Sequence, residues 1–154
     1  MRLRFVWPGR TRSPELRALE EAYLEKIKRL QPAEVVVTRE AAGLPEKAAA
    51  RVMAVEAWGL EKCLSDSYIV CLTDGGREMT SEGLASFLAK RNEDARGTAF
   101  VVGGFLGLDR ALLERADFKL SLSRMTFPHE LSRVMLLEQV YRALTMIRGR
   151  KYAK

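Results

Sequence analysis

The chain has 154 residues, 47% of them hydrophobic, which is enough for one domain with a substantial core. Its formal net charge of +6 favours a polyanionic partner, and its apolar runs are far shorter than the roughly 20 residues that cross a bilayer. Two cysteines, Cys63 and Cys71, with no CxxC pair and a single histidine in the chain, argue against a metal site and predict buried thiols in a reducing compartment. We therefore expect a soluble, cytoplasmic protein of one domain, residues 1–154, with no membrane segment and no metal.

Strand-like and helix-like patterns alternate along the chain. Leu3, Phe5 and Trp7 repeat with period two in the first strand, and Ser13 and Pro14 are suited to open the first helix. Asp74-Gly75-Gly76 is typical of a turn. The predicted strands cover residues 2–7, 34–39, 68–73, 98–102 and 118–122, and the predicted helices cover 14–30, 45–64, 81–91, 109–116 and 129–148. This order predicts an α/β fold, an α/β/α sandwich of about five or six parallel strands covered on both faces.

Three loops follow predicted strands, at residues 72–76, 103–107 and 122–127. Because parallel strands end at the same edge of a sheet, we expect these loops to form one site there. Their glycines let a ligand approach the backbone, whose amides and carbonyls can hydrogen-bond an adenine or a ribose. The first strand is not followed by GxGxxG, and no GxxxxGK[ST] occurs, which disfavours nicotinamide dinucleotides and nucleoside triphosphates.

The positive charge is concentrated near the end of the chain. Residues 124–154 contain seven basic residues against Glu130 and Glu138, which leaves +5 in this segment. The segment 148–154 has no acid and one aromatic residue, a composition suited to binding phosphate. His129 opens the last predicted helix and is either a base or a capping or packing group. No Ser-His-Asp or Cys-His set can be assigned, so hydrolytic chemistry is not supported.

Several motifs, spread over essentially the whole length, resemble one family. They are Leu72-Thr73-Asp74, Gly103-Gly104-x-x-Gly107-Leu108, Leu122-Ser123 with Thr126-x-x-His129, Arg133-Val134, and Glu138-x-x-Tyr141-Arg142-Ala143. The chain resembles the bacterial large-subunit (23S) ribosomal RNA pseudouridine N3-methyltransferases of the SPOUT class, the RlmH family. The resemblance implies an S-adenosyl-L-methionine-dependent enzyme that acts on ribosomal RNA, on assembled ribosomes, as an obligate homodimer. It also implies a C-terminal trefoil knot, which periodicity alone does not predict.

The resemblance assigns roles to individual residues. The implied cofactor-binding residues are Leu72, Gly103, Gly104, Leu122, Ser123, Arg124, Met125, Thr126 and Phe127. Gly107 is expected to shape the same pocket. Arg142 and Tyr152 are expected to reach the neighbouring subunit's site as catalytic residues, with His129 as a third candidate. The expected RNA-binding residues are Arg148, Arg150, Lys151 and Lys154.

The last helix is predicted to form the dimer interface, because its apolar residues exceed what one sheet face needs. These residues are Leu131, Val134, Met135, Leu137, Val140, Tyr141, Leu144 and Ile147. The chain departs from the family pattern at Ala153, where a histidine is usual, and at Phe105-Leu106 inside the glycine motif. Two alternatives remain open: a SPOUT methyltransferase acting on another RNA such as transfer RNA, and a ribosome-binding factor without catalysis.

Overall fold

The computed structural model describes residues 1–41 and 45–152, which contain a five-stranded sheet. Its strands are β1 (Leu3–Pro8), β2 (Ala33–Thr38), β3 (Ser67–Glu78), β4 (Gly97–Val101) and β5 (Phe118–Ser121). All neighbouring pairs are parallel, in the order β2-β1-β4-β3-β5. The predicted parallel sheet is therefore confirmed, and β3, β4 and β5, which lead into the three loops of interest, lie side by side.

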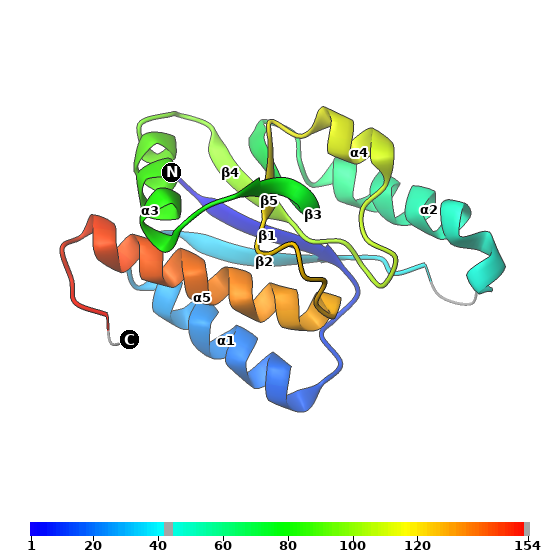
Figure 1. The fold of residues 1–154 in the computed structure, drawn as a ribbon, viewed down its shortest axis with the longest axis horizontal. Helices are drawn as coiled ribbons and strands as arrows, with labels where there is room; N and C mark the ends of the chain where they lie inside the picture. Colours follow the sequence, from blue (N-terminus) through cyan, green and yellow to red (C-terminus); the bar gives the residue numbers. More distant parts are fainter. Residues whose placement is uncertain (42–44, 153–154) are drawn as a thin grey trace.

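Helices cover both faces of this sheet, as the alternating pattern predicted (Figure 1). They are α1 (Pro14–Lys28), the short 3₁₀ helix η1 (Glu46–Ala48) that leads into α2 (Ala49–Lys62), α3 (Ser81–Asn92), α4 (Arg110–Arg115) and α5 (His129–Ile147). Buried side chains of α1, α3 and α5 pack on one face, and those of α2 and α4 pack on the other. The layered sandwich is thus confirmed, while the trefoil knot stays a prediction.

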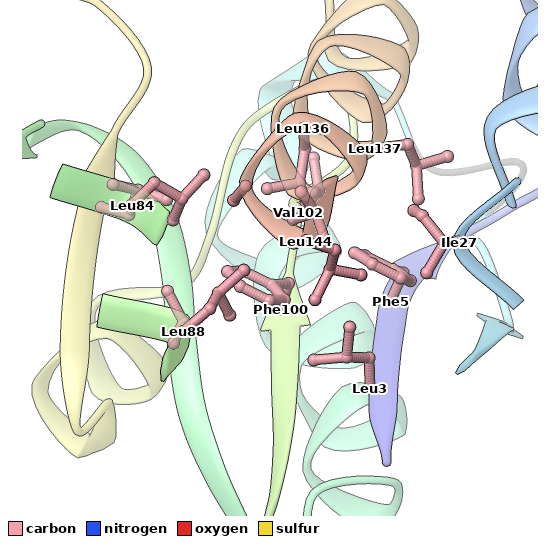
Figure 2. Packing of buried hydrophobic residues seen from close by; sticks show 14 of the residues in the cluster. Leu3, Phe5, Ile27, Leu84, Leu88, Phe100, Val102, Leu136, Leu137 and Leu144 are labelled. Atoms are coloured by element: carbon pink, nitrogen blue, oxygen red, sulfur yellow. The ribbon is translucent and has the colours of Figure 1, made fainter. Parts of the chain in front are cut away.

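The larger core lies between the sheet and α5. Phe5 and Phe100 stack with their ring centroids 5.6 Å apart, and Leu136 and Leu137 of α5 pack in the same cluster (Figure 2). Val6 of β1 is buried too, in the cluster on the opposite face. Both faces of β1 are therefore covered, as expected of a strand inside a parallel sheet.

The predicted turn at Asp74-Gly75-Gly76 is wrong, because β3 continues through these residues in the same direction. Leu72 and Arg77 both pair with Leu120, so residues 73–76 bulge out of the ladder. A Cβ on Gly76 would lie 2.8 Å from backbone atoms of the neighbouring strand, a space that glycine alone fits. The glycines permit a β-bulge, and the bulge places Thr73 and Asp74 beside the ends of β4 and β5.

Two further predictions need adjustment. Leu137, Val140 and Leu144 are buried in the chain's own core, so they provide no surface for a dimer. Val134 is also buried, at 6% exposure. Cys71 is fully buried, and burial raises the pKa of its thiol to about 12, but Cys63 is only half-buried. None of the helices in the described part of the chain is long and apolar enough to cross a membrane.

Candidate functional site

A cavity of about 430 Å³ opens at the carboxyl ends of β3, β4 and β5, within the size range of small-molecule sites. Its walls combine the bulge of β3, the loops after β4 and β5, and the first turn of α5. The lining residues are Leu72, Thr73, Asp74, Val102, Gly103, Gly104, Phe105, Leu106, Gly107, Leu108, Leu113, Leu122, Ser123, Met125, Thr126, Phe127, His129 and Ser132. The structure thus brings together the three segments that the sequence predicted to form one site.

The loop after β4 folds so tightly that side chains are excluded from it. A Cβ on Gly103 would lie 2.4 Å from the carbonyl carbon of Gly107, and Gly107 itself has a φ of +82°. The Gly107 amide donates to the Gly104 carbonyl over 3.0 Å. A Cβ on Gly104 would lie 2.8 Å from Oε2 of Glu56, a buried carboxyl on α2. These glycines therefore form a compact backbone wall that a ligand can approach closely.

The loop between β5 and α5 is held by its own serines. The Ser121 hydroxyl donates to the Ser123 carbonyl over 3.0 Å, and the Ser123 hydroxyl accepts from the Met125 amide over 3.0 Å. His129 follows at the first position of α5 and is half-buried. Burial, and secondarily the nearby Arg133 charge, lower the pKa of His129 below its ordinary value of 6.5. The imidazole is therefore neutral at neutral pH.

Arg133, one turn further along α5, is 1% exposed and fastens the end of β1 to this helix. Its guanidinium donates to the carbonyls of Pro8 over 2.8 Å and Gly9 over 3.2 Å, and to the Thr11 hydroxyl over 3.1 Å. The Glu130 carboxylate accepts two further bonds from the Arg12 and Ser13 amides, each over 3.0 Å. The loop after β1 is thereby fixed against the helix that lines the cavity.

The cavity lining has little charge. Among the described residues that line it, Asp74 and His129 are the titratable side chains, and none is a lysine or an arginine. Arg124 was predicted as a cofactor residue, but it does not line the cavity: its side chain is 86% exposed and lies 3.6 Å from Glu78. Within residues 1–41 and 45–152, no group of His, Cys, Asp or Glu side chains is arranged to hold a metal ion.

A second cluster, made of aromatic and charged side chains, surrounds Arg142 near the far end of α5. Nε of Arg142 donates to Glu138 over 3.0 Å, and its guanidinium carbon lies 4.5 Å from the ring centroid of Tyr152. Tyr152 packs edge-on against Tyr141, with ring centroids 5.1 Å apart. Burial, and then a hydrogen bond with Tyr23, raise the pKa of Tyr152 to about 12. We call these five residues the tyrosine cluster.

Within one chain, the tyrosine cluster is remote from the cavity. Thirteen positions separate His129 from Arg142 on α5, which corresponds to about 20 Å at 1.5 Å per residue. Of the three catalytic candidates, the structure therefore places His129 at the cavity and leaves Arg142 and Tyr152 away from it. The two residue groups can act together only if a second subunit joins them.

The basic tail is partly engaged by the chain itself. The Arg148 guanidinium donates to the carbonyl of Leu30, which lies just after α1. The Arg150 amide donates to the Thr145 carbonyl over 2.9 Å. The side chains of Arg150 and Lys151 are exposed, as expected of residues that bind RNA. Lys154 and Ala153 lie outside the described residues.

Some lining residues were given no individual role from the sequence. Asp74 belongs to the segment 72–76 that was expected at the site, but it joins the cavity through the bulge of β3 and not through the predicted turn. Ser132 follows His129 by three positions, and this helical spacing would have placed both on one face. Phe105 lines the cavity wall and is nevertheless 78% exposed, so it marks the rim.

Comparison with known proteins gives one consistent result. Residues 1–153 match the family described as "Predicted SPOUT methyltransferase". The chain is 41% identical to ribosomal RNA large subunit methyltransferase H of Nitratidesulfovibrio vulgaris (strain DP4), over 97% of this chain and 96% of that protein. It is 42% identical to the protein of the same name from Carboxydothermus hydrogenoformans, over 90% and 92% respectively.

The fold itself is shared with a solved structure of distant sequence. A probable methylase family protein from Haemophilus influenzae Rd KW20 superimposes with a TM-score of 0.58 at 11% identity, covering 99% of this chain and 70% of that one. At this identity the likeness concerns the fold alone. It agrees with the parallel α/β arrangement described above.

Proposed function

The chain belongs to the SPOUT methyltransferase family, and we propose that it transfers a methyl group from S-adenosyl-L-methionine to N3 of a pseudouridine in large-subunit (23S) ribosomal RNA. The observation that carries this proposal is the glycine-walled cavity of low charge at the strand ends. The names of relatives about 40% identical over nearly their full length support the RNA substrate. Bacterial ribosomes place this activity in the cytoplasm.

The cavity suits S-adenosylmethionine in size and in charge. The donor carries a sulfonium and an ammonium group, so a lining without lysine or arginine, with Asp74 at the edge and a neutral His129, avoids repulsion. Backbone groups of the Gly103–Gly107 loop and of residues 122–127 would hold its adenine and ribose, while Leu72, Leu122 and Phe127 supply apolar walls.

When bound, the donor would supply an electrophilic methyl group that the uracil nitrogen attacks in line, with S-adenosylhomocysteine as the leaving group. The protein's main contribution is to hold the two reactants in line, and such positioning is worth roughly 7 to 11 kcal/mol in well-oriented reactions. The rigid loops fixed by Arg133 and by the Ser121 and Ser123 hydrogen bonds are suited to this task. The N3 imide proton must leave before attack, so a group that favours the anion is also needed.

The tyrosine cluster is the proposed substrate side. Tyr152 keeps its proton at neutral pH, because its pKa is raised to about 12, so it acts as a hydrogen-bond donor or a stacking surface and not as a base. Arg142 is paired with Glu138, which offsets much of its charge. Its proposed role is to donate hydrogen bonds to the carbonyl oxygens that flank N3 and share the negative charge of the anion. Exposed Arg150 and Lys151 would contact phosphates.

Because these residues lie about 20 Å from the cavity along α5, we propose an obligate homodimer in which each site combines the cavity of one subunit with the tyrosine cluster of the other. Apolar surface for the interface remains on α1 and α5, where Leu19 is exposed and Leu131 and Met135 are half-buried. Leu19 and Met135 also border a second hollow of about 540 Å³ on this face. In the proposed dimer, a second copy of this chain fills that hollow.

The test is a methyl-transfer assay with radiolabelled S-adenosylmethionine on purified large subunits, whole ribosomes and bulk transfer RNA, taken from a strain that lacks the gene. We expect incorporation into ribosomal RNA at one pseudouridine, located by mass spectrometry of nuclease fragments. Incorporation into transfer RNA alone would replace the substrate assignment. Failure to bind S-adenosylmethionine by calorimetry would instead favour a ribosome-binding factor without catalysis.

A further inference from the structure

The outer face of α2 exposes an aromatic residue within a row of cations. Arg51, Val55, Trp58 and Lys62 are all exposed and follow one another at intervals of four, three and four residues, so they lie along one side of the helix. Trp58 is 63% exposed, and the Lys62 ammonium lies 3.4 Å from its ring centroid. We call these four residues the α2 stripe.

Trp58 belongs to neither of the hydrophobic clusters that the described residues form. The buried residues of α2 are Glu56, Ala57 and Leu60, on the side that faces the sheet and the glycine loop. Trp58 points away from that side. Large aromatic residues in such a setting are typical of binding surfaces.

The α2 stripe carries two positive charges, Arg51 and Lys62, and no acidic residue of its own. Arg51 and Lys62 form no ion pair with any carboxylate of the described residues, whereas the nearby Glu61 is already paired with Arg115 over 3.6 Å. The buried acid of this helix, Glu56, faces inward. A polyanion with planar aromatic groups complements this surface better than an acidic peptide, because the peptide offers nothing to stack on Trp58.

The helix that carries the α2 stripe packs against the glycine wall of the cavity with its opposite side. Glu56, on the inner side of the same helical turns, approaches the backbone of Gly104 so closely that a Cβ there would lie 2.8 Å from its Oε2. The glycine wall of the cavity therefore rests on α2. An RNA strand whose reacting base enters the cavity has this helix within reach of its flanking nucleotides.

We propose that the α2 stripe is a second RNA-binding surface, which holds single-stranded nucleotides flanking the methylated base; this rests on the function proposed above. One base stacks on Trp58, and phosphates pair with Arg51 and Lys62. Lys62 leaves the ring when the base takes its place and binds the adjoining phosphate. The surface belongs to the opposite face of the sheet from α5, so dimerisation through α5 leaves it open (Figure 1).

The test measures binding of a fluorescently labelled 12-nucleotide single-stranded RNA by anisotropy at several salt concentrations. Trp58→Ala is expected to weaken binding roughly tenfold, and Trp58→Phe, which keeps a stacking ring, to retain most of the affinity. Lys62→Gln should lower the slope of log K against log salt by about 0.7, the value for one phosphate contact with a single strand. Lys90→Gln on α3, across the sheet, removes an equally exposed charge and should leave the slope unchanged.

Methylation of large subunits gives an independent readout, in which Trp58→Ala raises KM but leaves kcat and S-adenosylmethionine affinity unchanged. Unaltered RNA affinity and KM in Trp58→Ala, with thermal melting as in the wild type, would overturn the proposal. A Trp58→Ala protein with a changed oligomeric state in light scattering would overturn it too, because the face would then be an interface between copies. If large subunits are not methylated at all, the function proposed above fails, while the RNA-binding measurement still decides the role of the α2 stripe.

Discussion

The two ends of α5 carry different kinds of site: a cavity at its first turn and a cluster of aromatic and charged side chains near its last turns. At its first turn, backbone from three loops forms a cavity with two titratable side chains, Asp74 and His129. Near its other end, the tyrosine cluster consists of side chains whose partners come from α1, α5 and the tail. In the function proposed above, the cavity is formed within one chain, whereas the tyrosine cluster acts at the cavity of another subunit.

The strongest expected effect comes from filling the glycine wall. Gly103→Ala would place a methyl group 2.4 Å from the Gly107 backbone. The loop must then move, and we expect roughly 100-fold weaker binding of S-adenosylmethionine by calorimetry. Gly75→Ala is the matched control, because a Cβ there meets nothing within 4 Å. Equal losses in both variants would show that the cavity wall is not the cause.

Mixed dimers test whether the tyrosine cluster of one subunit acts at the cavity of the other. Arg142→Ala alone should lower kcat by roughly 100-fold and leave cofactor affinity intact. If sites are shared between subunits, mixing this variant with Gly103→Ala restores one intact site in each mixed dimer. Activity should then recover to about a quarter of the wild-type level, because half of the randomly assembled dimers are mixed. Absence of any recovery, with subunit exchange verified by mass spectrometry, would place both groups in one subunit.

A smaller effect is expected when the cavity gains charge. The pKa of His129 is lowered from 6.5, chiefly by burial and then by Arg133, so the folded protein binds this proton less readily than the unfolded chain. Lowering the pH below 6.5 through the folded pKa therefore costs folding stability and places a cation beside the sulfonium. We expect affinity for S-adenosylmethionine to fall about fivefold once His129 is protonated. His129→Gln should remove this step of the binding profile.

The mildest prediction concerns Asp74. Because this carboxylate is exposed to solvent, Asp74→Asn should weaken binding of S-adenosylmethionine by only about threefold. The affinity for S-adenosylhomocysteine, which lacks the sulfonium charge, should fall by less in this variant. Calorimetry with both ligands distinguishes the charge from general damage to the bulge of β3, since damage would affect the two ligands equally.

The cavity was predictable from the sequence because it depends on local features. Strand ends and paired glycines are visible in a single sequence, and the parallel arrangement brings them to one edge. The strand order could not be obtained this way, and neither could the bulge of β3, since Gly76 requires contact with Lys119 of a strand formed 43 positions later. The contact of Tyr152 with Tyr23 is likewise invisible to any local pattern.

Trp58 illustrates a different limit. The spacing of Arg51, Trp58 and Lys62 along a helix is readable from the sequence, but whether that side faces the sheet or the solvent depends on packing. Hydrophobicity alone would have placed a tryptophan inside. The resemblance to a family assigned roles to residues of the cavity and the tail and said nothing about this helix.

The position of Arg133 has a consequence for how the chain acquires its structure. Its guanidinium satisfies carbonyls of Pro8 and Gly9, residues 125 and 124 positions earlier. The end of β1 therefore keeps unpaired buried acceptors until the last helix docks. Such contacts of long sequence separation slow folding, because the intervening chain must be ordered first. A nascent chain that lacks α5 is consequently expected to expose the Phe5–Phe100 core to chaperones, and the enzyme to become compact only after its final helix has left the ribosome.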